Sequence, residues 1–155
     1  MVALRPIELL YEERDALEAL LRLLQHEQTR LVEADFDALV TVTGEKAGIV
    51  SRMSELAKSR HHWLAAAGFD PDETGMRAWL EQSPAPNVME AWAGTLSLAR
   101  AAKELNRVNG LLIGKHMSRS QQLLHVLIGQ CGSGMIYGPD GQSKVIPALR
   151  SLVVS

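Results

Sequence analysis

Apolar residues recur along this chain at the spacing of amphipathic helices. In the first segment, leucines stand seven residues apart, and a second seam of the same period carries two polar residues. The two seams are Leu10, Leu17, Leu24 and Leu31, and Ile7, Arg14, Leu21 and Gln28. This spacing predicts a long amphipathic helix. The polar positions, and the extra width that Leu20 and Leu23 give to the stripe, favour a helical bundle over a two-stranded coiled coil.

A second periodic segment follows "EADFD", with Asp35 as its expected cap and Gly68 as its expected end. Helix is expected there, although "TVTGEKAG" contains two glycines and several β-branched residues, so the first turns are expected to be irregular. A short helix is predicted next, because Asp70, Pro71 and Glu73 have the order of a capping box.

The longest segment runs from Val88 to about Gln130, and Asn87 and Glu90 repeat the capping arrangement at its start. Three long helices with a short connecting one predict an all-α antiparallel bundle over residues 1–130. From residue 131 the pattern changes to "CGSG", "YGPDG" and a stretch interrupted by Pro147, which predicts a flexible C-terminal tail with a turn motif over residues 131–155.

The amino-acid composition and charge indicate which class of protein to expect. Apolar residues make up 46%, charged residues 22%, and the formal net charge is −2, which is ordinary for a globular domain and unlike a nucleic-acid-binding protein. No signal peptide and no apolar run of roughly 20 residues is present, so a cytoplasmic protein without membrane insertion is expected. Residues 1–35 are mainly acidic and residues 86–130 mainly basic, which predicts attraction between the first and last helices.

Signals for catalysis or metal binding are weak. "DPDETGMRAWLE" places oxygen-bearing residues at the spacing of a calcium loop, but Arg77 occupies a position that is usually apolar, and the capping box already explains the acidic residues. None of the five histidines has the spacing of a helical metal pair. Cys131 is the single cysteine and has no evident base beside it. We therefore expect no enzyme activity, no cofactor and no metal site.

Polar residues interrupt the apolar seam of the long last segment at Asn106, Asn109 and His116. Buried asparagines can specify the register of packed helices. The alternative, that these three side chains face water, fits the sequence equally well.

Three stretches together resemble the FlgN family of flagellar export chaperones: the connector "GFDPDE", the segment "ELNRVNGLLI" and the terminal "IYGPDGQ". The resemblance covers nearly the whole chain, and the last two stretches are its most specific parts. It implies a cytoplasmic chaperone that binds the terminal helices of hook–filament junction proteins, prevents their premature assembly and delivers them to the type III export gate.

The family resemblance also implies which residues act. The C-terminal half of the long helix and the tail would bind the client, and Tyr137 would engage the export gate. The client-binding residues expected on this basis are Leu112, Ile113, Met117, Leu123, Leu124 and Leu127. A monomer or weak homodimer is expected. The competing interpretation is a structural or regulatory bundle that dimerises through the leucine seam and has no role in export.

Overall fold

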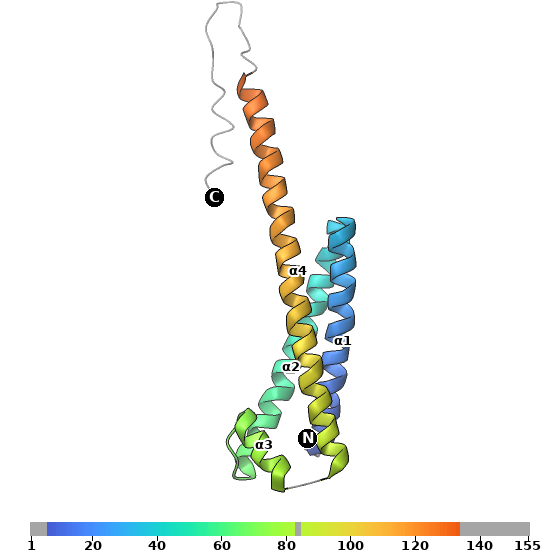
Figure 1. Cartoon of the computed structure of the whole chain (residues 1–155), viewed down its shortest axis with the longest axis vertical. Helices are drawn as coiled ribbons and strands as arrows, with labels where there is room; N and C mark the ends of the chain where they lie inside the picture. The colour runs from blue at the N-terminus through green and yellow to red at the C-terminus, as the bar shows by residue number, and fades with distance from the viewer. Residues whose placement is uncertain (1–5, 83–84, 134–155) are drawn as a thin grey trace, which may run out of the picture. The chain divides into compact units, whose positions relative to one another are not determined.

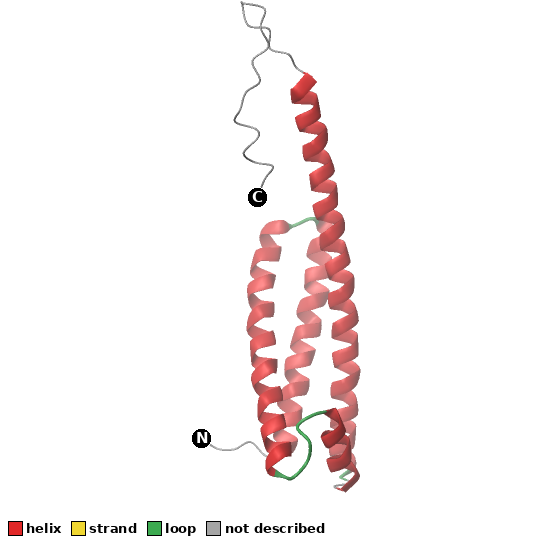
Figure 2. Ribbon diagram, turned by 90° about the vertical axis from the view of Figure 1, so that its left-hand side faces the viewer, coloured by secondary structure: helices red, strands yellow, loops and turns green. Residues whose placement is uncertain are grey.

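The computed structural model describes residues 6–82 and 85–133, and side chains as far as residue 130. Every secondary-structure element in this part of the chain is an α-helix (Figure 2), which confirms the all-α class. The helices are α1 (Pro6–Glu33), α2 (Phe36–Ala66), α3 (Glu73–Gln82) and α4 (Pro86–Ser133).

The chain divides into two units, Met1–Gly114 and Lys115–Ser155, and α4 contributes to both. α4 continues through Ser133, three residues past the predicted end of the long helix at Gln130. Residues 134–155 lie outside the described part, so the flexible tail and its predicted boundary stay predictions.

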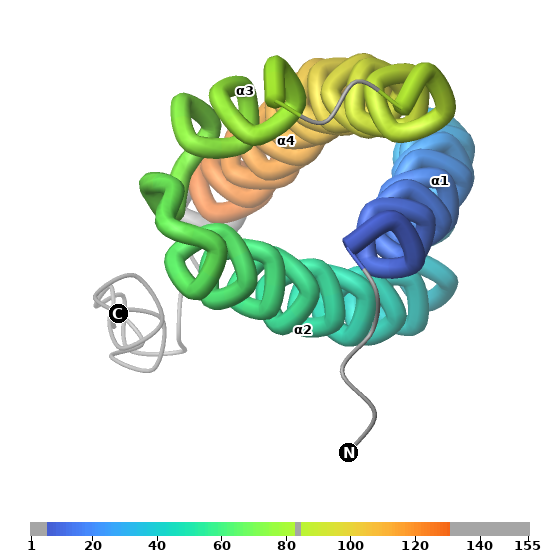
Figure 3. The backbone as a smooth tube through the Cα atoms, turned by 90° about the horizontal axis from the view of Figure 1, so that it is seen from below, coloured from blue at the N-terminus to red at the C-terminus, as the bar shows by residue number. Residues whose placement is uncertain are grey.

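In the first unit, α2 runs antiparallel to both α1 and α4. Leu10 near the start of α1 packs with Leu64 near the end of α2, and with Val88 and Trp92 at the start of α4. Further along α1, Leu24 lies in a second apolar cluster with Ala102 of α4. Figures 1 and 3 show α1 beside α2 and beside the first part of α4, with the short α3 next to the end of α2.

The leucine seam of α1 lies inside the bundle. Leu10, Leu17, Leu24 and Leu31 are all buried. A helix that buries its apolar stripe within its own chain has no such stripe left for a partner. The interpretation that the chain dimerises through this seam is therefore wrong.

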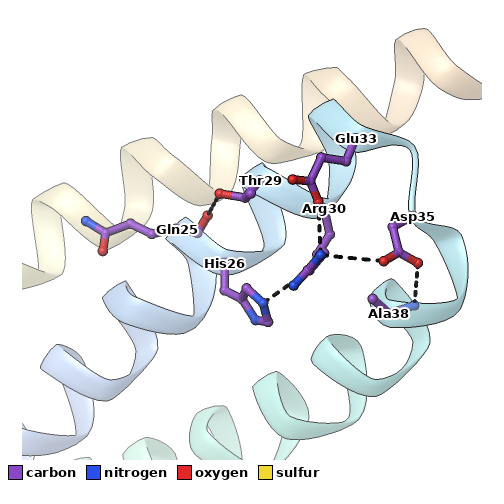
Figure 4. Close-up of polar contacts among 7 residues, drawn as sticks. All are labelled: Gln25, His26, Thr29, Arg30, Glu33, Asp35 and Ala38. Atoms are coloured by element: carbon purple, nitrogen blue, oxygen red, sulfur yellow. Dashed lines mark hydrogen bonds and ion pairs between the residues drawn. The ribbon is translucent and has the colours of Figure 1, made fainter.

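The connection between α1 and α2 is tight. The amide of Asp35 donates to the carbonyl of Arg30 and that of Ala34 to Leu31, which is the Schellman pattern of hydrogen bonds. Ala34 occupies the left-handed position with φ of 56°, where glycine is the usual residue. Asp35 then caps α2, because its Oδ1 accepts from the amide of Ala38 at 3.2 Å (Figure 4), as the sequence predicts.

Arg30 holds this connection from the side of α1. Figure 4 shows its guanidinium between three neighbours: it donates to Nε2 of His26 and lies 2.9 Å from Glu33 Oε2 and 3.6 Å from Asp35 Oδ2. In the same view the Thr29 hydroxyl donates to the carbonyl of Gln25. All of these contacts are local, so they fix the turn rather than the bundle.

α2 is helical throughout, including the stretch "TVTGEKAG", so the prediction of irregular first turns is wrong. Packing of the helix against the rest of the bundle overrides the low helix propensity of its two glycines. The predicted end at Gly68 is confirmed. Gly68 has φ of 85°, and the amide of Phe69 donates to Leu64 in a second Schellman motif.

α3 is capped by Asp72 rather than by Asp70. α3 begins at Glu73, and Asp72 Oδ1 accepts from the amide of Gly75 at 2.8 Å. Gly75 is required for steric reasons, because a Cβ there would stand 1.8 Å from the carbonyl oxygen of Asp70. Since residues 73–82 form a helix, the oxygen atoms of "DPDETGMRAWLE" cannot wrap around a calcium ion.

α4 likewise begins before its predicted cap. The amides of Val88 and Met89 donate to the carbonyl of Ala85, which places Pro86 at the first helical position and Asn87 inside the helix. Proline is favoured at that position because its missing N–H has no partner there in any helix.

Two polar layers cross the first unit. The tryptophan layer consists of Glu13 of α1, Arg60 of α2 and Trp92 of α4. The Nε of Arg60 donates to both carboxylate oxygens of Glu13, at 3.1 and 3.0 Å. The same guanidinium lies 4.9 Å from the centroid of the Trp92 ring, a cation–π contact.

The asparagine layer consists of Glu27 of α1, Lys46 of α2 and Asn109 of α4. Lys46 Nζ lies 3.2 Å from Glu27 Oε1, and Asn109 Nδ2 donates to Glu27 Oε2 at 2.7 Å and to the carbonyl of Leu24 at 2.9 Å. Asn109 is therefore buried and hydrogen-bonded to α1, whereas Asn106 is exposed and His116 half-buried. Asn109 is thus buried, as the first of the two interpretations requires, and Asn106 faces water, as the second requires.

Candidate client-binding surface

The six client-binding candidates all lie on α4, and the structure places them in two environments. In the first unit, Leu112 is half-buried and Ile113 is 40% exposed. In the second unit the other four candidates are exposed over more than half of their surface. These are Met117 (59%), Leu123 (57%), Leu124 (57%) and Leu127 (58%).

Most of the exposed apolar residues of the second unit gather on one face of the helix. At about 100° per residue, Met117, Leu123, Leu124, Leu127 and Ile128 fall within an arc of roughly 140°. This set is called the apolar arc below. Lys115, Ser118, Gln122 and His125 point to the opposite side, whereas His116 and Ser120 lie among the residues of the arc.

Two exposed apolar residues of this stretch were not among the candidates. Ile128 is 41% exposed and lies on the apolar arc, whereas Val126 is 55% exposed and lies among the polar residues. The sequence signal for Ile128 is its position four residues after Leu124, which places both on one helical face.

The charge of this stretch has one sign. Between Glu104 and Asp140 the sequence contains Arg107, Lys115 and Arg119 and no acidic residue. At its start, Arg107 forms a bidentate pair with Glu104 through contacts of 2.7 and 2.9 Å. The hydrogen bonds from Arg107 lower the pKa of Glu104 below its usual value, so this exposed carboxylate stays ionised.

This arrangement suits the binding of a second helix. The apolar arc offers leucine and methionine side chains at the i, i+4 and i+7 spacing that a second helix can pack against. Within the described residues, no three histidine, cysteine, aspartate or glutamate side chains are grouped to hold a metal ion. The described helices also include none that is long and apolar enough to cross a membrane. Tyr137, the expected residue for the export gate, lies outside the described residues.

The fold and the exposed arc define an all-α bundle protein that presents an apolar helical face to solvent. The chain belongs to the FlgN family, because the family model described as "FlgN protein" matches residues 1–144. The curated "Flagella synthesis protein FlgN" of Yersinia enterocolitica is 29% identical over 135 residues, which is 86% of this chain and 85% of that protein.

A protein of the same name from Proteus mirabilis is 26% identical over 110 residues, which is 71% of this chain and 68% of that protein. No solved structure matches the chain. The family that the resemblance indicated is thus shown, and with it a place in flagellar synthesis.

Proposed function

We propose that this protein is a cytoplasmic export chaperone for the hook–filament junction proteins. It binds the terminal helices of these clients, keeps them from assembling prematurely and delivers them to the flagellar type III export gate. Membership of a flagella synthesis family supports the setting, and the apolar arc of α4 is the observation that carries the binding role.

The physical reason is the exposure of the arc. Leu123, Leu124 and Leu127 each leave more than half of their surface in water, and covering such side chains stabilises a complex by roughly 25 cal/mol per Å² of apolar surface removed from water. Junction proteins polymerise through terminal helices with apolar stripes. A helix of this kind packed against the arc would be shielded from self-association.

The test of the client surface is a pair of charged substitutions. Leu123→Glu with Leu127→Glu would place two carboxylates one helical turn apart on the arc, and binding of junction-protein terminal peptides should weaken on the order of 100-fold. The matched control is Gln122→Glu with His125→Glu, which adds the same groups on the opposite side of the same helix. Isothermal titration calorimetry measures both, and circular dichroism checks that helix content is unchanged.

Equal peptide binding by wild type and by the Leu123→Glu, Leu127→Glu variant would remove the arc from the client surface. If wild type binds no junction-protein peptide at all, the chaperone function itself is wrong.

The roles of the tail and of Tyr137 need separate experiments. Deletion of residues 131–155 should weaken client binding if the tail contributes to capture, and unchanged binding would contradict that role. Tyr137→Ala should leave client binding intact and reduce retention of the chaperone–client complex by purified export-gate protein. Loss of client binding in this variant would instead place Tyr137 in the client surface.

A further inference from the structure

α2 carries two heptad seams, and the bundle uses only one of them. The inner seam packs into the first unit and includes Val42, Lys46, Ile49, Met53, Leu56 and Arg60. A second series with the same alternation of four and three residues is shifted by one position from the inner seam and begins nearer to the start of the helix. This α2 outer seam consists of Phe36, Val40, Thr43, Ala47, Val50 and Ser54.

The α2 outer seam is apolar, neutral and open to solvent. Phe36, Val40 and Val50 are 54%, 75% and 48% exposed. Thr43 donates its hydroxyl to the carbonyl of Leu39 at 2.8 Å, so its polar group is satisfied within the helix. The seam contains no charged residue over roughly 27 Å of helix. A solvent-facing helical surface normally carries charged side chains, so this face has the composition of an interface.

Two glycines of the same helix have no packing role in the bundle. A Cβ added to Gly44 or to Gly48 would have no heavy atom within 4 Å. Both glycines weaken the helix relative to alanine, and neither adopts a backbone conformation that needs glycine. Gly44 flanks the seam and would allow another backbone to approach it closely, whereas Gly48 points roughly 120° away from the seam. The bundle itself supplies no such neighbour.

The charges at the two ends of the seam point to the partner. Asp37 stands beside the start of the seam and Lys58 just beyond its end. Both side chains are exposed, and neither forms an ion pair within the described residues. If two copies of α2 pack antiparallel about Ala47 and Gly48, each Asp37 lies opposite the second copy's Lys58. Parallel packing would instead place like charges together.

We propose that the α2 outer seam is the interface on which a second copy of this chain packs, helix against antiparallel helix, to form a two-fold symmetric dimer. Such a dimer needs one surface that is complementary to itself. The seam meets this condition because it is neutral, because Gly44 flanks its middle, and because its ends carry opposite charges. The dimer leaves the leucine seam of α1 buried and does not depend on the chaperone function.

Sedimentation equilibrium of the full-length chain tests the proposal. Wild type should show a monomer–dimer equilibrium, and Val40→Glu with Val50→Glu should weaken dimerisation on the order of 100-fold, because four carboxylates would be buried without partners. The matched control is Val32→Glu, a valine of similar exposure on α1 outside the seam, which should leave the equilibrium unchanged.

Charge exchange tests the antiparallel register. Asp37→Lys alone and Lys58→Asp alone should each weaken the dimer by roughly fivefold, and the double variant should restore it, because the pairs re-form with reversed polarity. Failure of the double variant to recover would overturn the antiparallel arrangement.

Three other results would overturn the dimer. They are a monomeric wild type at every concentration at which the protein stays dissolved, an unchanged mass for the Val40→Glu, Val50→Glu variant, and equal weakening by Val32→Glu. If Val40→Glu with Val50→Glu abolishes binding of junction-protein peptides while the mass stays unchanged, the seam belongs to a client helix. Peptide titration of the same samples separates this result from a failure of the chaperone function, in which wild type binds no peptide.

Discussion

The tryptophan layer and the asparagine layer are built on one plan from the same helices, and they differ in what α4 contributes. In each, a buried glutamate of α1 meets a cation of α2. Glu13 and Glu27 are fourteen residues apart, as are Arg60 and Lys46, so both ion pairs share one antiparallel register. The third member is an aromatic ring in one layer and an amide in the other.

The tryptophan layer satisfies all of its charged groups. Arg60 pairs with Glu13 through two contacts and lies over Trp92, which itself belongs to the larger apolar cluster. The arginine side chain is only 13% exposed. A buried ion pair stabilises a fold only when its geometry compensates for lost hydration. This layer has both an Arg60 Nε–H shared between the two carboxylate oxygens and the contact with the aromatic face.

The asparagine layer is less complete. Asn109 is buried and donates two hydrogen bonds, but its Oδ1 has no hydrogen-bond partner in the described residues. The Lys46 side chain remains 27% exposed, so its ammonium group is still partly hydrated. A buried acceptor without a partner costs free energy. We infer that this layer fixes which residue of α4 faces Glu27, while the tryptophan layer contributes more to stability.

The largest effect is expected from Arg60→Ala. This change leaves the carboxylate of Glu13 buried without its cation, and the free energy of unfolding should fall by about 3–5 kcal/mol. The matched control is Arg52→Ala, because Arg52 also bridges α2 to α1 through Glu12 but is exposed; its cost should stay below about 1 kcal/mol. Urea unfolding followed by circular dichroism measures both. Similar losses for the two variants would show that burial does not distinguish these pairs.

A smaller loss is expected from Lys46→Ala. Glu27 loses its cation but keeps the hydrogen bond from Asn109, and water can reach the space that the partly exposed lysine leaves. The cost should be about 1–2 kcal/mol in the same urea experiment. Lys58→Ala, an exposed lysine on the same helix, is the control and should change the unfolding free energy very little. A loss as large as that of Arg60→Ala would mean that the two layers are energetically equal.

Sequence reasoning predicted the elements of this fold better than the contacts between them. The four helices, the cap at Asp35 and the end of α2 at Gly68 follow from local rules of spacing and capping, and the structure confirms them. The caps at Asp70 and Asn87 were each wrong by two residues. Asp72 offers the same capping chemistry as Asp70, and α4 begins at Pro86, a residue favoured at the first helical position.

The two polar layers could not be predicted from local rules of spacing and capping. Glu13 and Glu27 look like ordinary surface charges, and the acidic start of the chain was expected to attract the basic last helix. Instead Glu12, Glu13 and Glu27 all pair with cations of α2. The equal spacing of fourteen residues in α1 and α2 was a signal of the shared register, but reading it requires knowing that the two helices are antiparallel neighbours.

The site was predictable only in part for the same reason. The apolar residues of α4 from Met117 onward are evident in the sequence, yet periodicity alone does not say whether a helical stripe is covered by the rest of the chain. The structure shows the seam of α1 buried and Leu123, Leu124 and Leu127 exposed, although both are leucine-rich. Burial depends on packing between distant segments, which a local pattern does not contain.

The smallest and most discriminating change is Asn109→Leu. Leucine is larger than asparagine but has the same branching at Cγ. It removes the unpartnered Oδ1 and leaves Glu27 paired with Lys46, so the free energy of unfolding should change by less than about 1 kcal/mol or rise. Register should suffer instead, because an apolar side chain slides along its neighbours without losing a specific hydrogen bond. Two-dimensional amide NMR should then show broadened or duplicated signals for α4 residues near position 109.

Asn109→Ala is the control for volume and should cost about 2 kcal/mol of unfolding free energy through the cavity that it leaves. Suppose instead that Asn109→Leu loses more than about 2 kcal/mol of unfolding free energy and still gives a single sharp set of NMR signals. The asparagine layer would then stabilise the bundle as the tryptophan layer does.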